Sequence, residues 1–235
     1  MGWLRSLSRN SEARKFMLNL SSYNGNQYVG VFSCANENIS LIPVDSSETL
    51  VNDLESALQV KCLKTNIAST NLIGALVAMN SYGAIVASMA SDVEVEFLSK
   101  HLTVYRLEDR YNAAGNNIVV NDKGALINPE IDPKLYREIA DTLQVEVVAG
   151  TIAGQNIVGS MCCATNKGML CHPESTKAEF EVLHSVLKVK PAIGTLNYGS
   201  GMVGACIVAN SKGGAVGFRS TPIELGRVED ALDIY

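Results

Sequence analysis

The sequence has neither an excess of basic residues nor a long apolar run. Lysine and arginine total 19 against 24 aspartate and glutamate residues, so the 235-residue chain carries a net charge of -5. Binding to a nucleic-acid backbone depends on basic side chains that displace counterions, and this composition argues against RNA or DNA as the main partner. The longest apolar run, near residues 72–79, is interrupted by glycine and is shorter than the roughly 18 residues of a membrane-spanning helix. We expect no membrane or DNA partner.

Histidine is scarce, and the cysteines do not follow the pattern of a secreted protein. The six cysteines lie mostly in apolar runs without a preceding signal peptide, which predicts reduced thiols in a cytoplasmic protein. The three histidines are His101 and His184, on predicted helices, and His172, at a predicted strand exit before Pro173. We interpret them as solvent-facing or structural. We therefore expect no catalytic residue, no metal site and no cofactor.

The first 14 residues differ from the rest of the chain. They include positive charges and Trp3 but no sustained apolar segment, so we predict a loose arm over residues 1–14 and a single domain over residues 15–235. An alternative interpretation places the start of translation at Met17.

Three landmarks recur along the chain in the same register. A glycine after a small or apolar residue recurs at spacings of 44, 41, 44 and 45, and the pattern Leu-x-Val or Leu-x-Ile recurs at the same spacings. The glycines are Gly30, Gly74, Gly115, Gly159 and Gly204, and the second pattern begins at Leu58, Leu102, Leu143, Leu187 and Leu232. A predicted hairpin turn lies eight or nine residues after each glycine, at Asn38, Gly83, Gly124, Gly168 and Gly213. The sequence therefore predicts five repeats of 41–45 residues.

Each repeat is predicted to contain two strands around a turn, a helix and a third strand. The strands run from the first glycine to just past the turn, and capping boxes begin the helices at Ser91, Thr176 and Thr221, while Asp132 precedes Pro133 at another helix start. The chain ends at Tyr235 without the third strand of the fifth repeat, whereas residues 14–20 have no partner in the first. We expect residues 14–20 to complete the fifth repeat and close a ring.

Three cysteines within residues 162–171 raise the question of a metal or nucleophilic site. In the repeat register, Cys162 and Cys163 correspond to Val77 and Ala78, and Cys171 corresponds to Val86. Adjacent strand residues point to opposite faces, which is poor geometry for binding one ion. The register favours core packing, while a metal site and a reactive thiol remain open alternatives.

A closed array of five such units resembles the pentein fold, a five-bladed α/β propeller. Two families with this fold compare with the chain: the guanidine-modifying enzymes and the archaeal and eukaryotic translation initiation factor 6, the ribosome anti-association factor. The segments over residues 145–173, 194–213, 113–132 and 28–32 are similar to the fourth, fifth, third and first repeats of the second family. The absence of a polar tail beyond Tyr235 resembles the archaeal members.

The resemblance implies a function without catalysis. It implies a monomer that binds the large ribosomal subunit, mainly at ribosomal protein uL14 with the sarcin-ricin loop of the RNA nearby, and that blocks joining of the small subunit. Residues matching the ribosome contacts include Gly30, Gly74 and Asn116. Eukaryotic members have arginines where this chain has Ala75 and Ser81, so contacts made by those arginines are not expected here. The alternative is a guanidine-modifying enzyme with Cys206 as the nucleophile.

Overall fold

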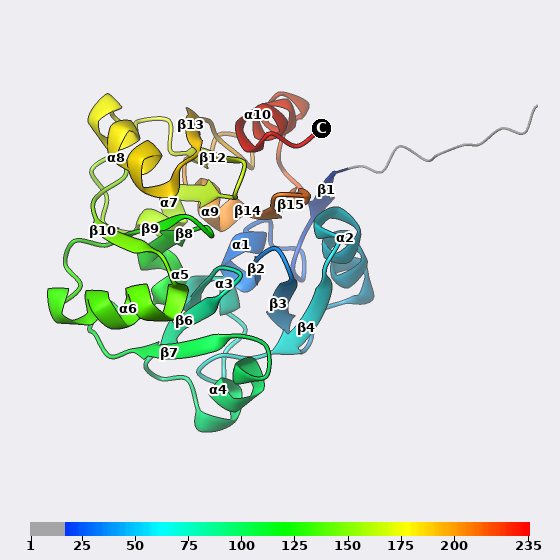
Figure 1. Ribbon diagram of the computed structural model, residues 1–235. Coiled ribbons are helices and arrows are strands. Elements are labelled where there is room, and N and C mark those ends of the chain that lie inside the picture. The colour runs from blue at the N-terminus through cyan, green and yellow to red at the C-terminus, as the bar shows by residue number, and fades with distance from the viewer. Residues whose placement is uncertain (1–16) are drawn as a thin grey trace, which may run out of the picture.

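The structure, a computed structural model, describes residues 17–235 and forms five three-stranded sheets around one axis (Figure 1). In each sheet the strand nearest the axis, the inner strand, pairs antiparallel with a middle strand, which pairs parallel with an outer strand. The inner strands are β2 (Cys34–Ala35), β5 (Val77–Met79), β8 (Ile118–Val120), β11 (Cys162–Ala164) and β14 (Ile207–Asn210). The middle strands are β3 (Ile39–Pro43), β6 (Gly83–Ala87), β9 (Gly124–Ile127), β12 (Gly168–Cys171) and β15 (Gly213–Gly217). The outer strands are β4 (Lys61–Thr65), β7 (Thr103–Leu107), β10 (Glu146–Ala149), β13 (Lys190–Ile193) and β1 (Leu18–Ser21).

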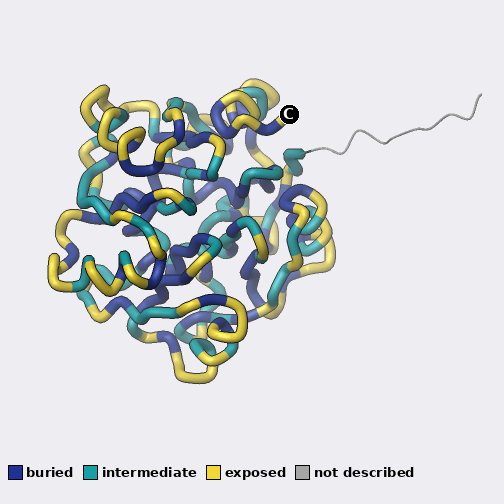
Figure 2. Tube along the Cα trace, viewed as in Figure 1, coloured by how far each residue is buried: buried dark blue, intermediate teal, exposed yellow. Residues whose placement is uncertain are grey.

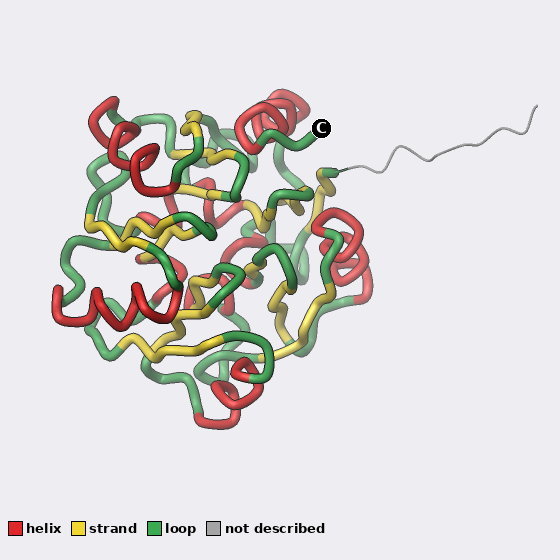
Figure 3. Tube along the Cα trace, in the orientation of Figure 1, coloured by secondary structure: helices red, strands yellow, loops and turns green. Residues whose placement is uncertain are grey.

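Two sets of helices pack against the sheets, one near the axis and one at the periphery (Figure 3). Five one-turn helices lie around the axis: α1 (Val29–Phe32), α3 (Ile73–Leu76), α5 (Ala114–Asn117), α7 (Val158–Met161) and α9 (Val203–Cys206). Five longer helices lie at the periphery: α2 (Glu48–Leu58), α4 (Asp92–Ser99), α6 (Tyr136–Leu143), α8 (Lys177–Leu187) and α10 (Pro222–Leu232). The 3-10 turn η1 (Pro133–Leu135) leads into α6. No helix within residues 17–235 combines the length and the apolar character that a membrane crossing requires.

The N-terminal strand completes the fifth blade, as predicted. Strand β1 pairs parallel with β15, from Leu18 opposite Gly214 to Ser21 opposite Gly217. Within the described residues β1 begins at Leu18, and residues 14–16 of the predicted strand, like the predicted arm over residues 1–14, lie outside them. The fifth blade also contacts the first, because the Asn210 side chain donates to the backbone oxygen of Asn36 over 3.1 Å. The five sheets therefore match the five predicted repeats, and the fifth contacts the first.

Burial follows the ring, with buried chain at the centre and exposed loops and helix surfaces outside (Figure 2). The longer helices are amphipathic. In α2, for example, Leu50, Leu54 and Leu58 are buried at helical spacing. The predicted capping boxes are confirmed at Ser91, Thr176 and Thr221, and Asp132 caps η1. Each box satisfies backbone N–H groups that the first helical turn leaves unpaired.

The glycine landmarks lie in helices rather than in strands, so this part of the prediction is wrong. Gly30, Gly74 and Gly115, for example, are the second residues of α1, α3 and α5, and the inner strands begin only after these helices. A segment of four residues is too short for its hydrophobic pattern to distinguish a helix from a buried strand. The Leu-x-Val landmark is also reinterpreted. In α2, Leu58 ends the helix and Gln59 caps it in the left-handed conformation before β4.

The turn glycines are required for close packing rather than for left-handed backbone. Gly124 is absent from the residues with positive φ among those described, but a Cβ on it would collide with the backbone oxygen of Val186 near the end of α8. In the first blade this position is occupied by Ile39, which pairs with Lys61 as Gly83 pairs with Thr103. The assignment of Asn38 to this position is therefore corrected by one residue.

The cysteines of the fourth blade occupy the expected strands. Cys162 and Cys171 are buried and opposite each other across β11 and β12, with their sulfurs 3.2 Å apart. Cys163 packs against a different apolar cluster, so Cys162 and Cys163 do not converge. His172 follows β12 as predicted, and its Nδ1 accepts the backbone N–H of Glu174. His184 is exposed on α8, whereas exposed His101 lies just beyond the end of α4.

Candidate functional site

The five one-turn helices meet around the axis through their glycines. A Cβ on Gly115 would overlap the backbone oxygens of Gly74 and Val77, and the same relation repeats from each blade to the next, including from Gly30 back to Gly204. Only a residue without a side chain permits this approach. We call these five helices, with the residue that precedes each of them, the glycine face. Of the predicted contact residues, Gly30, Gly74 and Asn116 all belong to this face and are half-buried.

The residue after each glycine differs between blades. The five residues are Val31, Ala75, Asn116, Ser160 and Ala205. Asn116 is not among the described residues with positive φ, which rules out a left-handed turn as the reason for asparagine. Its Oδ1 accepts a hydrogen bond from the Ser160 hydroxyl over 3.1 Å, while no intramolecular hydrogen bond is found from its Nδ2 to any described residue. The amide is therefore positioned by the fourth blade and retains donors for a partner.

Apolar residues precede all five one-turn helices, and sequence reasoning did not identify them. They are Tyr28, Leu72, Ala113, Ile157 and Met202. Leu72 and Met202 are 38% and 40% exposed, and the neighbouring Tyr198 is 84% exposed. The helices themselves contain no charged residue. An uncharged centre with exposed apolar side chains is the character of a protein-binding surface. The signal was available in the sequence, as an apolar residue two positions before every landmark glycine.

A narrow axial channel of about 110 Å³ runs between the glycine face and the inner strands. Its lining includes three cysteines, Cys34, Cys162 and Cys163, but neither a charged residue nor a histidine from the described chain. Burial raises the pKa of the Cys34 and Cys163 thiols to about 12. Thiols with such pKa values stay protonated near neutrality, and no neighbouring base is present to activate them.

Cys206, the proposed nucleophile of the enzyme alternative, lies at the end of α9 and is fully buried. Burial raises the pKa of its thiol above the ordinary value, although interactions with Ser200 and Asn197 oppose the rise. The sequence places Cys206 in a strand, and this prediction is wrong by one residue, since β14 begins at Ile207. A buried thiol with a raised pKa is a poor nucleophile, and the geometry does not support the enzyme alternative.

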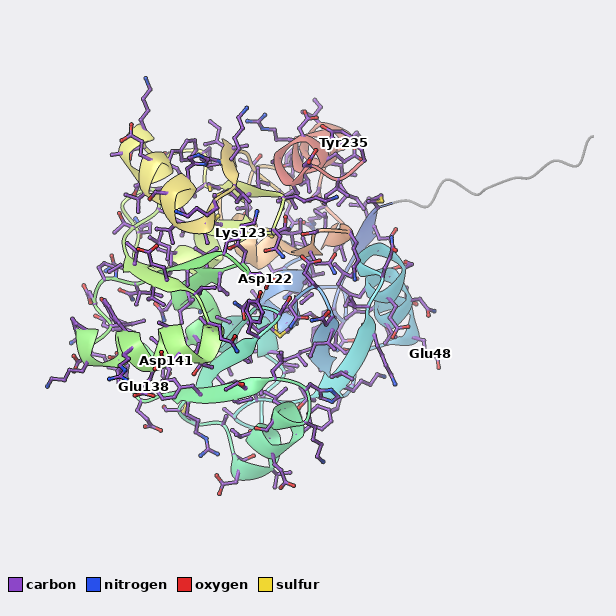
Figure 4. All side chains as sticks on the ribbon, in the orientation of Figure 1. Glu48, Asp122, Lys123, Glu138, Asp141 and Tyr235 are labelled. Carbon is purple, nitrogen blue, oxygen red and sulfur yellow. The ribbon has the colours of Figure 1, made fainter. Side chains whose placement is uncertain are left out.

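Beyond the opposite end of the channel lies a smaller cavity lined by an asparagine ring, comprising Asn36, Asn80, Asn121, Thr165 and Asn210, together with Glu37 and Asp122. Each residue of the ring ends or follows an inner strand, and each is buried. The Asn121 side chain donates to the backbone oxygens of Thr165, in the next blade, and of Leu187, at the end of α8. Its Oδ1 accepts the backbone N–H groups of Lys123 and Gly124. Figure 4 shows the adjoining Asp122 and Lys123 near the middle of the view.

Carboxylates at three peripheral helices connect each helix to the loop that enters its blade. Besides capping α4, the Glu94 carboxylate accepts the backbone N–H groups of Ala68 and Ser69, and Glu179 and Glu224 have equivalent partners. Burial would raise the pKa of each carboxyl, but the hydrogen bonds that it accepts outweigh this effect and place the pKa below its ordinary value. These groups position loops beside the glycine face.

Comparisons with known proteins agree with this architecture. The family model described as the eIF-6 family matches residues 18–231. Translation initiation factor 6 of Methanocaldococcus jannaschii is 41% identical over 220 residues, covering 90% of this chain and 96% of that protein. Translation initiation factor 6 of Thermoplasma acidophilum is 38% identical over 216 residues, covering 92% of this chain and 100% of that protein. The chain therefore belongs to the eIF-6 family, whose archaeal members include these translation initiation factors.

Proposed function

We propose that this protein binds the large ribosomal subunit through the glycine face and sterically prevents the small subunit from joining. The observation that carries the proposal is the uncharged glycine face with exposed Leu72, Tyr198 and Met202, on a chain of the eIF-6 family. Such a face suits a protein surface, for which about 800 Å² per partner is enough for a stable, specific complex. Activity then requires only a rigid body of sufficient size.

The proposed main partner is ribosomal protein uL14, with the sarcin-ricin loop of the RNA at the edge of the interface. The net charge of -5 supports a protein as the main contact, because it leaves no surplus of cations for phosphate groups. In this proposal the protein acts as a monomer in the cytoplasm, and Gly30, Gly74 and Asn116 lie in the interface. The glycines contribute by allowing backbone approach, and Asn116 contributes its unused amide donors.

Co-sedimentation with purified 50S and 30S subunits tests the proposal. We expect the protein to sediment with 50S alone and to reduce formation of 70S particles when both subunits are mixed. Binding to neither subunit, or equal binding to both, would contradict the proposed function. A Leu72→Ser, Met202→Ser double variant should lose 50S binding with only a modest fall in melting temperature, since 38% of Leu72 and 40% of Met202 are already exposed.

Asn116→Ala tests the amide separately. We expect 50S binding to weaken by about 1–2 kcal/mol, the scale of one interfacial hydrogen bond, with little change in melting temperature. Asn38→Ala is the matched control, because Asn38 is an exposed asparagine on the turn at the other end of the channel. Intact binding of the Asn116 variant would remove this residue from the interface. A lowered melting temperature with intact binding would assign it to the contact with Ser160.

A further inference from the structure

A cleft of about 560 Å³ opens at the periphery, between α8 of the fourth blade and α10 of the fifth. Its floor is the outer strand β13, and its walls include Phe180 from α8 and Arg227 from α10. Lys167, from the turn between β11 and β12, lies at one end. The volume falls within the range of about 300–1,000 Å³ typical of small-molecule sites. The cleft is remote from the glycine face, because the channel lining and the cleft lining share no residue.

The cleft exists because one position of the outer strand carries a small side chain in this blade. The outer-strand residue that pairs with the third residue of the middle strand faces the helix of the next blade, and the five residues are Leu63, Tyr105, Val148, Ala192 and Asn19. In the fifth blade, Asn19 fills the space by donating to Asp53 and Ser56 on α2. Ala192 is the smallest of the five and cannot reach α10 in this way. The gap is thus a local departure from the repeat.

The turn beside the cleft departs from the repeat as well. Lys123 and Lys212 hold the same turn position in their blades, and each donates its Nζ to a backbone oxygen of the following blade. Lys167 makes no such bond to any described residue and lines the cleft instead. Thr165 replaces the asparagine of the ring here, and its hydroxyl bonds within its own turn rather than to the fifth blade. Two hydrogen bonds found at other blade junctions are therefore missing beside the cleft: the one from the turn lysine and the one from the ring amide.

Three cations and two acids, Asp230 and Asp233, line the cleft, so three positive and two negative charges leave a net charge of +1. Lys167, Lys190 and Arg227 form no ion pair within 4 Å in the part of the chain that the structure describes. Of the two acids in the lining, Asp230 accepts a hydrogen bond from the hydroxyl of Tyr235, which Figure 4 labels beside α10. Arg227 is oriented by its Nε, which donates to the backbone oxygen of Ile193 over 2.7 Å. This leaves the terminal nitrogens of its guanidinium group available for an anion.

The exposed edge of β13 could in principle accept another strand, but two features oppose it. Pro191 has no N–H to offer, and the oxygen of Ile193 is already bonded to Arg227. Phe180, Pro191 and Ile193 form an apolar surface that remains available for a compact ligand. Ile193 is 40% exposed. We propose that the cleft binds a small organic anion that joins one carboxylate or phosphate group to an apolar, ring-sized body. The acidic group contacts the three cations, and the apolar body packs on Phe180 and Pro191.

Three naphthalene probes test the proposal on the full chain: 2-naphthoate, 2-naphthyl phosphate and the neutral 2-naphthalenemethanol. We expect at least one anion to bind at one molecule per chain, about tenfold more tightly than the neutral probe, in a fluorescence titration at low salt. The tighter anion identifies the preferred acidic group. Equal binding of all three probes, or no binding, would overturn the proposal.

Two variants place the probe in the cleft. Lys190→Gln should weaken binding of the tighter anion at least fivefold, whereas Lys61→Gln should leave it unchanged, because Lys61 occupies the same register position on the outer strand of the first blade. Ala192→Tyr introduces the residue of the second blade and should abolish binding by filling the gap. Lys167→Gln, at an exposed turn position, provides a third variant if the tyrosine variant does not fold. Equal effects of Lys190→Gln and Lys61→Gln would show general surface attraction and contradict the proposal. None of these measurements involves ribosomal subunits, so the result is independent of the proposed function.

Discussion

The two ends of the axial channel hold the blades together by different means. At the glycine face, backbone meets backbone, and the absence of side chains makes the contact possible. At the asparagine ring, side-chain amides reach from one blade to the next and use their donors and acceptors within the protein. Because the blades meet through backbone atoms at the glycine face, the side chains there stay free for a partner. At the asparagine ring, most side-chain donors and acceptors are already used within the protein. The comparison supports docking at the glycine face.

Removal of the closing strand should disrupt both ends together. Deletion of residues 1–20 removes most of β1 and exposes the edge of β15, so we expect the protein to unfold or aggregate at room temperature. Deletion of residues 1–13 is the control and should change the melting temperature by no more than a few degrees. A thermal melt decides between them. A longer deletion that keeps the melting temperature of the full chain would show that β1 is dispensable for ring closure.

Substitution at the glycine face should come next in effect. Gly115→Val places a branched side chain against the backbone oxygens of Gly74 and Val77, and neither can move without displacing its helix. We expect the free energy of unfolding to fall by at least about 3 kcal/mol, the upper range for overpacking. Gly226→Ala, in α10, is the control because a Cβ there meets nothing within 4 Å. It should stabilise the protein by about 0.5–1 kcal/mol. Similar losses from both variants would contradict packing as the reason for the axial glycines.

Substitution at the asparagine ring should have a smaller effect. Asn121→Ala removes donors to Thr165 and Leu187 and leaves these buried oxygens unpaired, which should cost about 2–3 kcal/mol in urea unfolding. Binding to the 50S subunit should not change at saturating protein, because the ring faces away from the proposed interface. Asn121→Asp should not rescue stability, since a carboxylate cannot donate. Loss of 50S binding in a folded Asn121→Ala variant would contradict the division of roles between the two ends.

Acid should destabilise the protein through the peripheral carboxylates rather than through either end of the axial channel. Because hydrogen bonds lower the folded-state pKa of Glu94, Glu179 and Glu224, their stabilising contribution is complete above the unfolded-state pKa, about 4.3. It is lost as the pH falls through the lower folded-state pKa. We expect the melting temperature to be steady from pH 7 to about pH 5 and to decline below about pH 4. Glu94→Gln should reduce this decline, and Glu48→Gln, at an exposed site on α2, should not. Equal acid curves for both variants would contradict the assignment.

The sequence predicts the number of blades and their closure because two constraints repeat at fixed register. The axial glycines occupy positions where a side chain would not fit, and the leucines at or just after the ends of the longer helices are buried, so both remain readable against varied surroundings. The one-turn helices were not predictable, because four residues are too few to distinguish a helical from an extended period. Candidate contacts at Gly30, Gly74 and Asn116 could be placed on one face, but the apolar residues before each helix became meaningful only in three dimensions.

The asparagine ring was missed for a different reason. Its members recur three positions before the turn landmark, as Asn80 does before Gly83, but asparagine near a turn is ordinarily explained by local turn chemistry. Their amides also reach across blades, which no local pattern encodes. The shift of one residue at Asn38 arose in the same way. Ile39 replaces glycine where the following helix, α4, ends early at Ser99, and only the packing reveals this exception.

The pairing of β1 with β15 also sets the order in which this protein can be completed during synthesis. Of the described elements β1 leaves the ribosome first, yet its partner β15 is encoded almost 200 residues later, with Leu18 opposite Gly214. Four blades can therefore assemble while Leu18–Ser21 waits unpaired, and the fifth blade must form last. Contacts between chain ends are slow to form because a long loop must close first. Until then the growing chain exposes strand edges, which leaves it vulnerable to aggregation through most of its synthesis.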